Sequence, residues 1–215
     1  MLSATIVVER PQDCPWPLGG HRIVAMDDYA SNPRIVPVDT RVVNLCRNGG
    51  YLARSYDCSL LAEARGHAVL PSVATLAGLN CRTLHGPTLD RLNRALTILL
   101  KDHPPVSDRH RSILVVFGRA ADPCLQPLAA LAFDLFPCPL LTIDLDGRSR
   151  RVTGLRLATG RSVEAESGAL FRDSLEAWLS TGRPPSARSP DPWPYAELPG
   201  DSGDPRPAPS PDVNS

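Results

Sequence analysis

The stretch Arg41–Val73, RVVNLCRNGGYLARSYDCSLLAEARGHAVLPSV, decides the fold of this chain. It opens with a β-branched run, Arg41–Cys46, which predicts a buried strand. The next segment, Asn48–Arg65, carries apolar and aromatic side chains four residues apart, which predicts a helix that ends at Gly66. Ala68–Leu70 then predicts a second, short strand. Because strands and a helix alternate within this stretch, the sequence indicates an α/β fold.

The flanking sequence continues the alternation. Asp146-Gly147, between two apolar runs, is typical of a hairpin. The whole pattern predicts a three-layer, mostly parallel sheet with helices on both faces, followed by a C-terminal antiparallel hairpin plus helix. Further strands are predicted at Ala4–Val8, Ser112–Phe117, Leu141–Leu145 and Arg151–Leu157, and further helices at about 88–99, 125–135 and 163–179.

Composition divides the chain after Gly182. Residues 183–215 hold 10 of the 23 prolines and show almost no apolar periodicity. Such a segment buries too little apolar surface to offset its chain entropy, so we predict a disordered, Pro-rich tail. Residues 1–182 are then predicted to form one α/β domain.

Charge and cysteine usage exclude several classes of protein. The formal net charge is 0, so no long-range field attracts nucleic acid or an acidic membrane. The N-terminus lacks the pattern of a secretory signal, and no apolar run approaches the ~20 residues that span a bilayer. We therefore expect a cytoplasmic protein whose 6 cysteines are reduced. Their spacing and that of the histidines predict no metal site.

Polar side chains follow three of the predicted strands. Arg10 follows the first, Asn44 and Arg47 end the second, and Arg119 follows Ser112–Phe117. Because ligands bind outside the carboxyl ends of parallel strands, we expect these side chains to meet on one rim of the sheet. Arginines there could clamp a carboxylate or a phosphate through paired hydrogen bonds.

The helix predicted after Gly50 would add backbone N–H donors to the same anion. The candidate ligand-binding residues are therefore Arg10, Asn44, Arg47, Tyr51, Ser55 and Arg119. The alternative is that the arginines form surface ion pairs with Glu9, Asp13 and Asp122, and the sequence leaves both interpretations open.

Catalytic signals are weak in comparison. No phosphate-binding glycine motif of the GxGxxG or GxxxxGK[ST] type is present. Ser55 and Ser59 have no neighbouring His/Asp pattern that would activate a hydroxyl. Cys46 could have a lowered pKa beside Arg47, but a buried structural thiol is the better interpretation. We therefore predict no catalytic residue and no cofactor.

Several short motifs follow one another along the chain. NLCR (Asn44–Arg47), SLLAEARGH (Ser59–His67) and LPSV (Leu70–Val73) form the centre of the pattern. In these motifs the chain resembles the RimK-like ATP-grasp N-terminal domain, which precedes the ligase module of RimK-like ATP-grasp proteins. The resemblance spans roughly residues 4–180 and extends to IVVERPQD (Ile6–Asp13), VVFGR (Val115–Arg119) and LFPCPLL (Leu135–Leu141).

The resemblance implies a setting in carboxylate–amine ligation. ATP-grasp ligases activate a carboxylate as an acyl phosphate, and they need lysines on the nucleotide phosphates and a cluster of metal ligands. The only lysine here, Lys101, lies within the domain, and a Pro-rich segment follows residue 182. The expectation is thus a free-standing domain, non-catalytic alone, that is an accessory or substrate-binding module for a separately encoded ligase in bacterial peptide or amino-acid ligation.

The partners expected on this basis are that ligase and a small carboxylate or peptide ligand, with no nucleic acid and no membrane. Two alternatives stay open. The chain could be a small enzyme that acts on an anionic substrate at the arginine rim, or a truncated relic.

Overall fold

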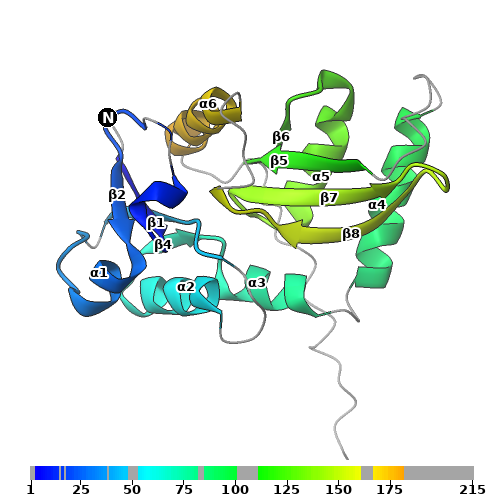
Figure 1. The fold of residues 1–215 in the computed structure, drawn as a ribbon. Helices are drawn as coiled ribbons and strands as arrows, with labels where there is room; N and C mark the ends of the chain where they lie inside the picture. Colours follow the sequence, from blue (N-terminus) through cyan, green and yellow to red (C-terminus); the bar gives the residue numbers. More distant parts are fainter. Residues whose placement is uncertain are drawn as a thin grey trace, which may run out of the picture.

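The computed structural model describes residues 3–14, 16, 18–37, 39–47, 53–81, 85–100, 111–160 and 167–181. Tyr51, Lys101 and the predicted tail 183–215 lie outside the described residues. A parallel sheet occupies the N-terminal half of the fold and an antiparallel sheet the C-terminal half (Figure 1).

The N-terminal sheet has the strand order β2-β1-β3-β4, and each neighbouring pair is parallel. The central strand β1 is buried along its whole length, which explains its unbroken apolar sequence ATIVV. The strands are β1 (Ala4–Val8), β2 (Arg22–Ala25), β3 (Arg41–Asn44) and β4 (Ala68–Leu70). The sequence predicted β1, β3 and β4 but missed β2.

Helices cover both faces of this sheet (Figure 1). On one face α1 (Met26–Ser31) and α2 (Arg54–Ala64) bury Tyr29 and Cys58 against Val7 and Val42. On the other face α6 (Ser167–Thr181) lies over the strands. The predicted α/β class and the helices on both faces are thus confirmed. Helix α2 begins at Arg54, later than predicted, with Ala53 as its extended N-cap.

The C-terminal sheet has the strand order β6-β5-β7-β8, and all of its pairs are antiparallel. The predicted hairpin is confirmed as β7 and β8. The placement of β5 beside the parallel strands is wrong, because a buried apolar run such as RSILVV fits either kind of sheet. The strands are β5 (Arg111–Val116), β6 (Arg119–Ala120), β7 (Leu140–Asp146) and β8 (Arg151–Leu157).

Helices α4 (His85–Leu99) and α5 (Gln126–Leu135) pack on one face of the antiparallel sheet. Their apolar stripes, led by Leu92, Leu96 and Leu128, are buried against Ile143 and neighbouring strand residues. A shorter helix, α3 (Val73–Asn80), follows β4, and Ser72 caps it by accepting the N–H of Thr75.

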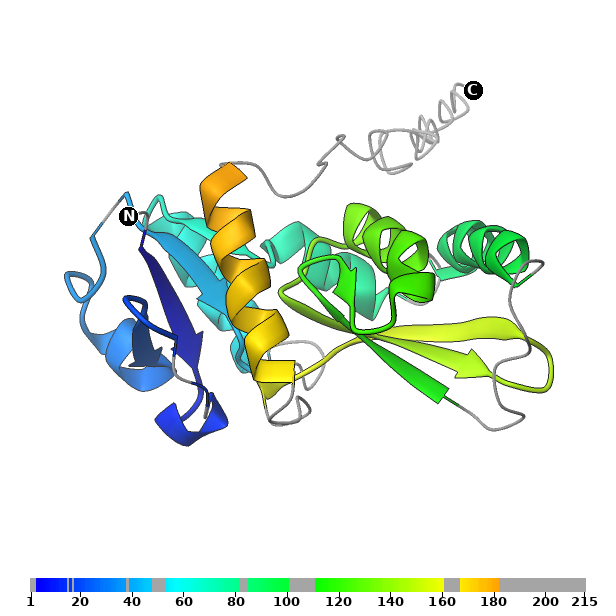
Figure 2. The same ribbon diagram turned by 90° about the horizontal axis from the view of Figure 1, so that it is seen from above.

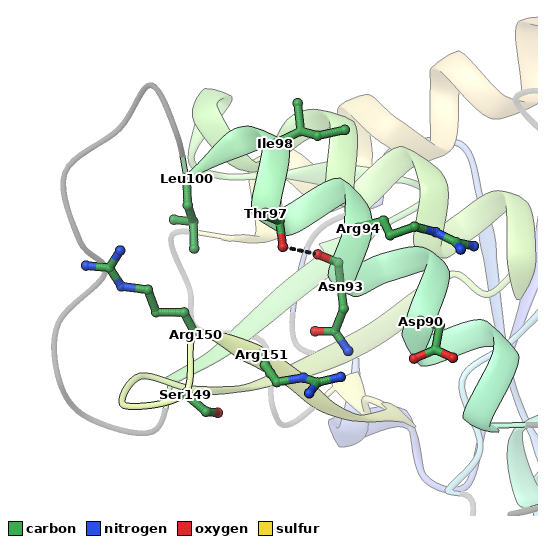
Figure 3. Close-up of a pocket in the computed structure, with 9 residues that line it drawn as sticks. All are labelled: Asp90, Asn93, Arg94, Thr97, Ile98, Leu100, Ser149, Arg150 and Arg151. Atoms are coloured by element: carbon green, nitrogen blue, oxygen red, sulfur yellow. Dashed lines mark hydrogen bonds between the residues drawn. The ribbon is translucent and has the colours of Figure 1, made fainter.

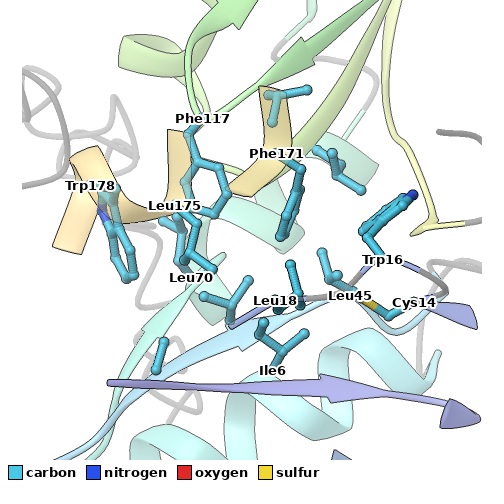
Figure 4. Close-up of a cluster of buried hydrophobic side chains, with 14 of the residues drawn as sticks. Ile6, Cys14, Trp16, Leu18, Leu45, Leu70, Phe117, Phe171, Leu175 and Trp178 are labelled. Carbon is cyan, nitrogen blue, oxygen red and sulfur yellow. The ribbon is translucent and has the colours of Figure 1, made fainter. Parts of the chain in front are cut away.

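Helix α6 joins the two halves of the fold (Figures 2 and 4). Phe171 on this helix is fully buried, with ring centroids 5.1 Å from Trp16 and 5.4 Å from Phe117. Trp16 precedes β2 and Phe117 follows β5, so the same aromatic cluster contacts both sheets. One hydrophobic core, which also holds Ile6 and Leu140, therefore spans the junction.

Four of the six cysteines pack as small, buried apolar side chains. Cys14, Cys46, Cys58 and Cys138 are buried, and all 6 cysteines are free thiols. Burial raises the pKa of Cys14 to about 11 and raises that of Cys138 further, which keeps both thiols protonated. In the part of the chain that the structure describes, no helix has the length and apolar character needed to cross a membrane.

A buried tyrosine–histidine pair links α1 to the segment between α2 and β4. The hydroxyl of Tyr29 lies 2.7 Å from His67 Nδ1, and Arg65 stacks over the tyrosine ring at 4.8 Å. Burial raises the pKa of Tyr29 to about 12, so the phenol stays protonated in this pair. Burial, and then the charge of Arg65, lower the pKa of His67 below its ordinary 6.5.

We expect stability to fall as the pH drops below about 6.5, the ordinary pKa of histidine. The unfolded chain takes up a proton at His67 more readily than the folded chain does. The loss of stability therefore grows as the pH falls, until the pH lies below the pKa of His67 in the folded protein. Urea unfolding between pH 8 and pH 5, roughly the span in which histidines titrate, measures this slope for the parent and for His67→Gln. Equal slopes for the two proteins would contradict the assignment of this pH dependence to His67.

Candidate functional site

Arg10 and Arg47 lie at the same edge of the parallel sheet, as the sequence predicted. They follow the neighbouring strands β1 and β3, and a short 3-10 helix, Pro11–Asp13, continues from Arg10. The Arg47 guanidinium reaches Glu9 through Nε at 3.6 Å and Asp13 through Nη2 at 3.9 Å. The backbone N–H of Arg47 also donates to Glu9 Oε1 at 3.2 Å.

These contacts define what the rim can bind. Two carboxylates already contact Arg47, so an incoming anion would compete with Glu9 and Asp13 for it. The ion-pair interpretation therefore applies to Arg47. Arg10 is exposed beside this cluster. The four charges of Glu9, Arg10, Asp13 and Arg47 sum to zero, which gives the rim no net attraction for an anion.

Asn44 and Ser55 lie behind the rim, each only 1% exposed. Asn44 Nδ2 donates to the Ser55 carbonyl at 2.7 Å and to Ser59 Oγ at 2.8 Å, while Oδ1 accepts the N–H of Cys46 at 3.0 Å. These bonds tie the end of β3 to the first turns of α2 and so hold Arg47 in place. A contact of either side chain with a ligand stays a prediction.

The two ends of α6 lie at opposite edges of the parallel sheet. Its start packs on Trp16, because a Cβ placed on Gly168 would come within 2.6 Å of that indole ring. Its end lies beside Arg41 at the start of β3, whose guanidinium donates to the carbonyls of Trp178 and Leu179, each at 3.3 Å. The helix is roughly 22 Å long at 1.5 Å per residue.

Arg119, in β6, lies beside the C-terminal end of this helix. It lines a cavity together with Trp178 and Thr181, in the last turn of α6. Arg10 and Arg47 instead follow the carboxyl ends of their strands, at the other edge. The prediction that all three arginines share one rim is therefore wrong, because β5 and β6 belong to the second sheet.

The cavity beside Arg119 has a volume of about 240 Å³. It lies where α5, α6 and the turn between β5 and β6 meet. Phe117 and Gly118 form that turn with positive φ angles of 46° and 78°. Gln126 on α5 fixes the turn by donating to the Gly118 carbonyl at 2.9 Å and accepting the N–H of Ala120 at 3.2 Å. The turn therefore holds Arg119 at the cavity in a defined position.

Two polar groups of α6 that line this cavity are buried without a hydrogen-bond partner among the described residues. They are the hydroxyl of Ser174, 1% exposed, and the indole N–H of Trp178, 7% exposed. Buried polar groups are nearly always bonded, so such a pair indicates a place where a ligand could bind. Both residues fall within the helix predicted at about 163–179, but no sequence pattern identified them as a pair.

A broader hollow of about 1010 Å³ lies between α4 and the turn of the β7–β8 hairpin (Figure 3). Two of its polar side chains, Asn93 and Thr97, are used within the protein. Asn93 accepts the N–H of Val152 at 2.7 Å and donates to the Val152 carbonyl at 3.4 Å, and Thr97 donates to the Asn93 carbonyl at 2.8 Å. The hollow ends at Leu100, and none of its described lining residues has a buried polar side-chain atom without a partner.

Comparison with known proteins identifies the family of this chain. No curated protein matches the chain. A family model described as the RimK-like ATPgrasp N-terminal domain matches residues 26–174, from α1 into α6. The match begins after the segment Ile6–Asp13, which the sequence resemblance had included. Because the match covers most of the chain, including β3, β4 and the whole antiparallel sheet, this protein belongs to the RimK-like ATP-grasp N-terminal domain family.

Proposed function

We propose that this domain is an accessory binding module for a separately encoded ATP-grasp carboxylate–amine ligase, with no catalytic activity of its own. Family membership is the observation that carries the proposal, because the family takes its name from its place before an ATP-grasp module. The ligation would join an amino acid or a peptide to an amine, and the domain would present or retain the carboxylate component.

The described side chains support binding rather than catalysis. His21 accepts the N–H of Ala4 through Nδ1 at 3.2 Å, and its Nε2 lies 3.0 Å from Glu176 Oε1. His67 is bonded to Tyr29, so neither of these histidines is positioned as a general base for a substrate. The cavity beside Arg119 instead offers hydrogen-bond donors that are suited to holding an anion.

The alternative of a small enzyme at an arginine rim has less support. It needs several arginines around one anion, and Arg119 lies at the opposite end of α6 from Arg10 and Arg47. Arg47 is also paired with two carboxylates. Of the three predicted arginines, Arg10 alone is then left at the rim for such a substrate.

The proposal predicts a complex and a kinetic effect. The purified chain would be mixed with a RimK-like ATP-grasp ligase encoded in the same genome, and complex formation followed by light scattering during gel filtration. Ligation would be measured across a range of carboxylate concentrations, and we expect the chain to lower the KM for the carboxylate. ATP turnover by the chain alone should stay at background.

An unrelated protein of similar size, added at the same concentration, controls for non-specific stabilisation of the ligase. Absence of a complex together with an unchanged KM would contradict the proposal. ATP turnover that co-purifies with the chain and survives removal of the ligase would contradict its non-catalytic character.

A further inference from the structure

We infer that the cavity between α5, α6 and the β5–β6 turn binds the carboxylate of a small molecule with an apolar body. The inference deepens the proposed function and rests on it for one point only, that the ligand is the carboxylate component of a ligation. Binding itself follows from the cavity and does not require a ligase.

The polar groups at the cavity specify a hydrogen-bond acceptor. The indole N–H of Trp178 can only donate, and its partner must therefore be an acceptor. Ser174 lies four residues earlier, on the same face of α6, and its hydroxyl is also without a partner among the described residues. A ligand oxygen near both groups would satisfy two buried donors that the described part of the fold leaves unpaired.

The geometry of Arg119 makes a carboxylate the acceptor that fits best. Arg119 is exposed at the mouth of the cavity, and its planar guanidinium matches the two oxygens of a carboxylate. Gln126 is already bonded to the β5–β6 turn, so it positions Arg119 rather than the ligand. Asp134 also lines the cavity and has a partner of its own, and its carboxylate offsets the charge of Arg119. Selection of a carboxylate therefore rests on the arrangement of the donors of Arg119, Ser174 and Trp178.

The walls select an apolar body for the ligand. Phe117, Phe133, Ala130, Ala177 and the ring of Trp178 line the cavity. Figure 4 shows Trp178 beside Phe117 and Leu175 at the end of α6, and the two aromatic rings lie 5.7 Å apart. A volume of about 240 Å³ admits a single small molecule, smaller than the ligands of typical drug-binding pockets.

The turn that carries Arg119 is held in a conformation that ordinary residues rarely adopt. Phe117 has a φ of 46° and is 2% exposed, so its ring is fixed in the cavity wall despite an unfavourable backbone. A Cβ on Gly118 would come within 3.1 Å of Phe133, which shows how closely the turn approaches α5. Backbone strain of this kind recurs at binding sites.

Indole N–H signals in a ¹H–¹⁵N spectrum test the inference directly. The chain has 3 tryptophans, Trp16, Trp178 and Trp193, and the variant Trp178→Phe assigns the relevant signal. Phenylacetate, a carboxylate on an aromatic body, would be titrated beside phenylacetamide, its neutral analogue. We expect a saturable shift of the Trp178 signal with phenylacetate and none with phenylacetamide, while Trp16 and Trp193 stay unchanged.

Two variants locate the contacts. Arg119→Gln should weaken the response to phenylacetate by about tenfold or more, the effect of losing a hydrogen bond between charged groups. Ser174→Ala should also weaken it, while thermal stability stays equal or rises, because the variant removes a buried hydroxyl without a partner among the described residues. Arg148→Gln, at an exposed arginine in the β7–β8 turn, is the matched control and should bind like the parent.

A Trp178 signal that does not shift up to the solubility limit of phenylacetate would overturn the inference. Equal responses to phenylacetate and phenylacetamide would overturn it as well, as would unchanged binding by Arg119→Gln. These outcomes are separate from those of the ligase experiment, because a chain that binds phenylacetate but not a ligase retains the site and loses only the proposed partner.

Discussion

Phe171→Ala is expected to lower the free energy of unfolding by about 3–5 kcal/mol, the usual cost of removing a buried aromatic ring. Phe171 is fully buried and contacts the rings of Trp16, between β1 and β2 of the parallel sheet, and of Phe117, directly after β5 of the antiparallel sheet. Its removal leaves a void that neighbours from two rigid sheets cannot readily close. The loss should therefore lie in the upper part of that range, as measured by urea unfolding.

Two comparisons separate the cost of the cavity from the cost of shortening any apolar side chain. Phe171→Leu retains much of the side-chain volume and should cost clearly less than Phe171→Ala. Ile98→Ala shortens an apolar side chain that is 64% exposed and should change stability by less than about 0.5 kcal/mol. A Phe171→Ala loss as small as that of Ile98→Ala would show that α6 does not join the two sheets.

Gly160→Ala is expected to be the most disruptive single-methyl change at the described glycines. A Cβ at this position would lie 2.1 Å from the backbone carbonyl oxygen of Asp13, far inside van der Waals contact. A backbone carbonyl cannot rotate away as a side chain can, so the segment after β8 or the 3-10 helix must shift. We expect a loss of about 3 kcal/mol, the upper end of the ordinary cost of overpacking.

Gly20→Ala is the matched control, because no atom lies within 4 Å of a Cβ placed there. It should melt within a few degrees of the parent, consistent with less than about 0.5 kcal/mol. Thermal melts of the three proteins under one condition measure the difference. If Gly160→Ala melts with Gly20→Ala, the close approach of the chain at Asp13 does not exist in solution.

The bounds of a strand could be predicted where the residues of the strand and its flanking turns show a clear pattern. The bounds of β4 and β8 were predicted correctly, because each is an apolar or alternating run between clear turn signals. Strand β2, RIVA, was missed because its four residues are too short to show a period. The partner of β5 could not be read from RSILVV, since pairing depends on distant segments and not on the strand itself.

The candidate site could likewise be predicted only where neighbouring strands determine the position of a side chain. Arg10 and Arg47 were placed together correctly because adjacent parallel strands bring their ends together. Arg119 was misplaced with the sheet assignment of β5. Ser174 and Trp178 could be predicted to share a helix face, but their lack of a partner depends on what packs beside α6, which a sequence period does not contain.

The bonds between Asn93 and Val152 have a consequence for the behaviour of this protein at high concentration. β8 is an outer strand of its sheet, and outer strands offer unpaired backbone groups to which other chains can add. The Asn93 amide occupies both the N–H and the carbonyl of Val152, as a neighbouring strand would. The side chain of a packed helix thereby blocks intermolecular strand addition at this point and protects the edge against aggregation.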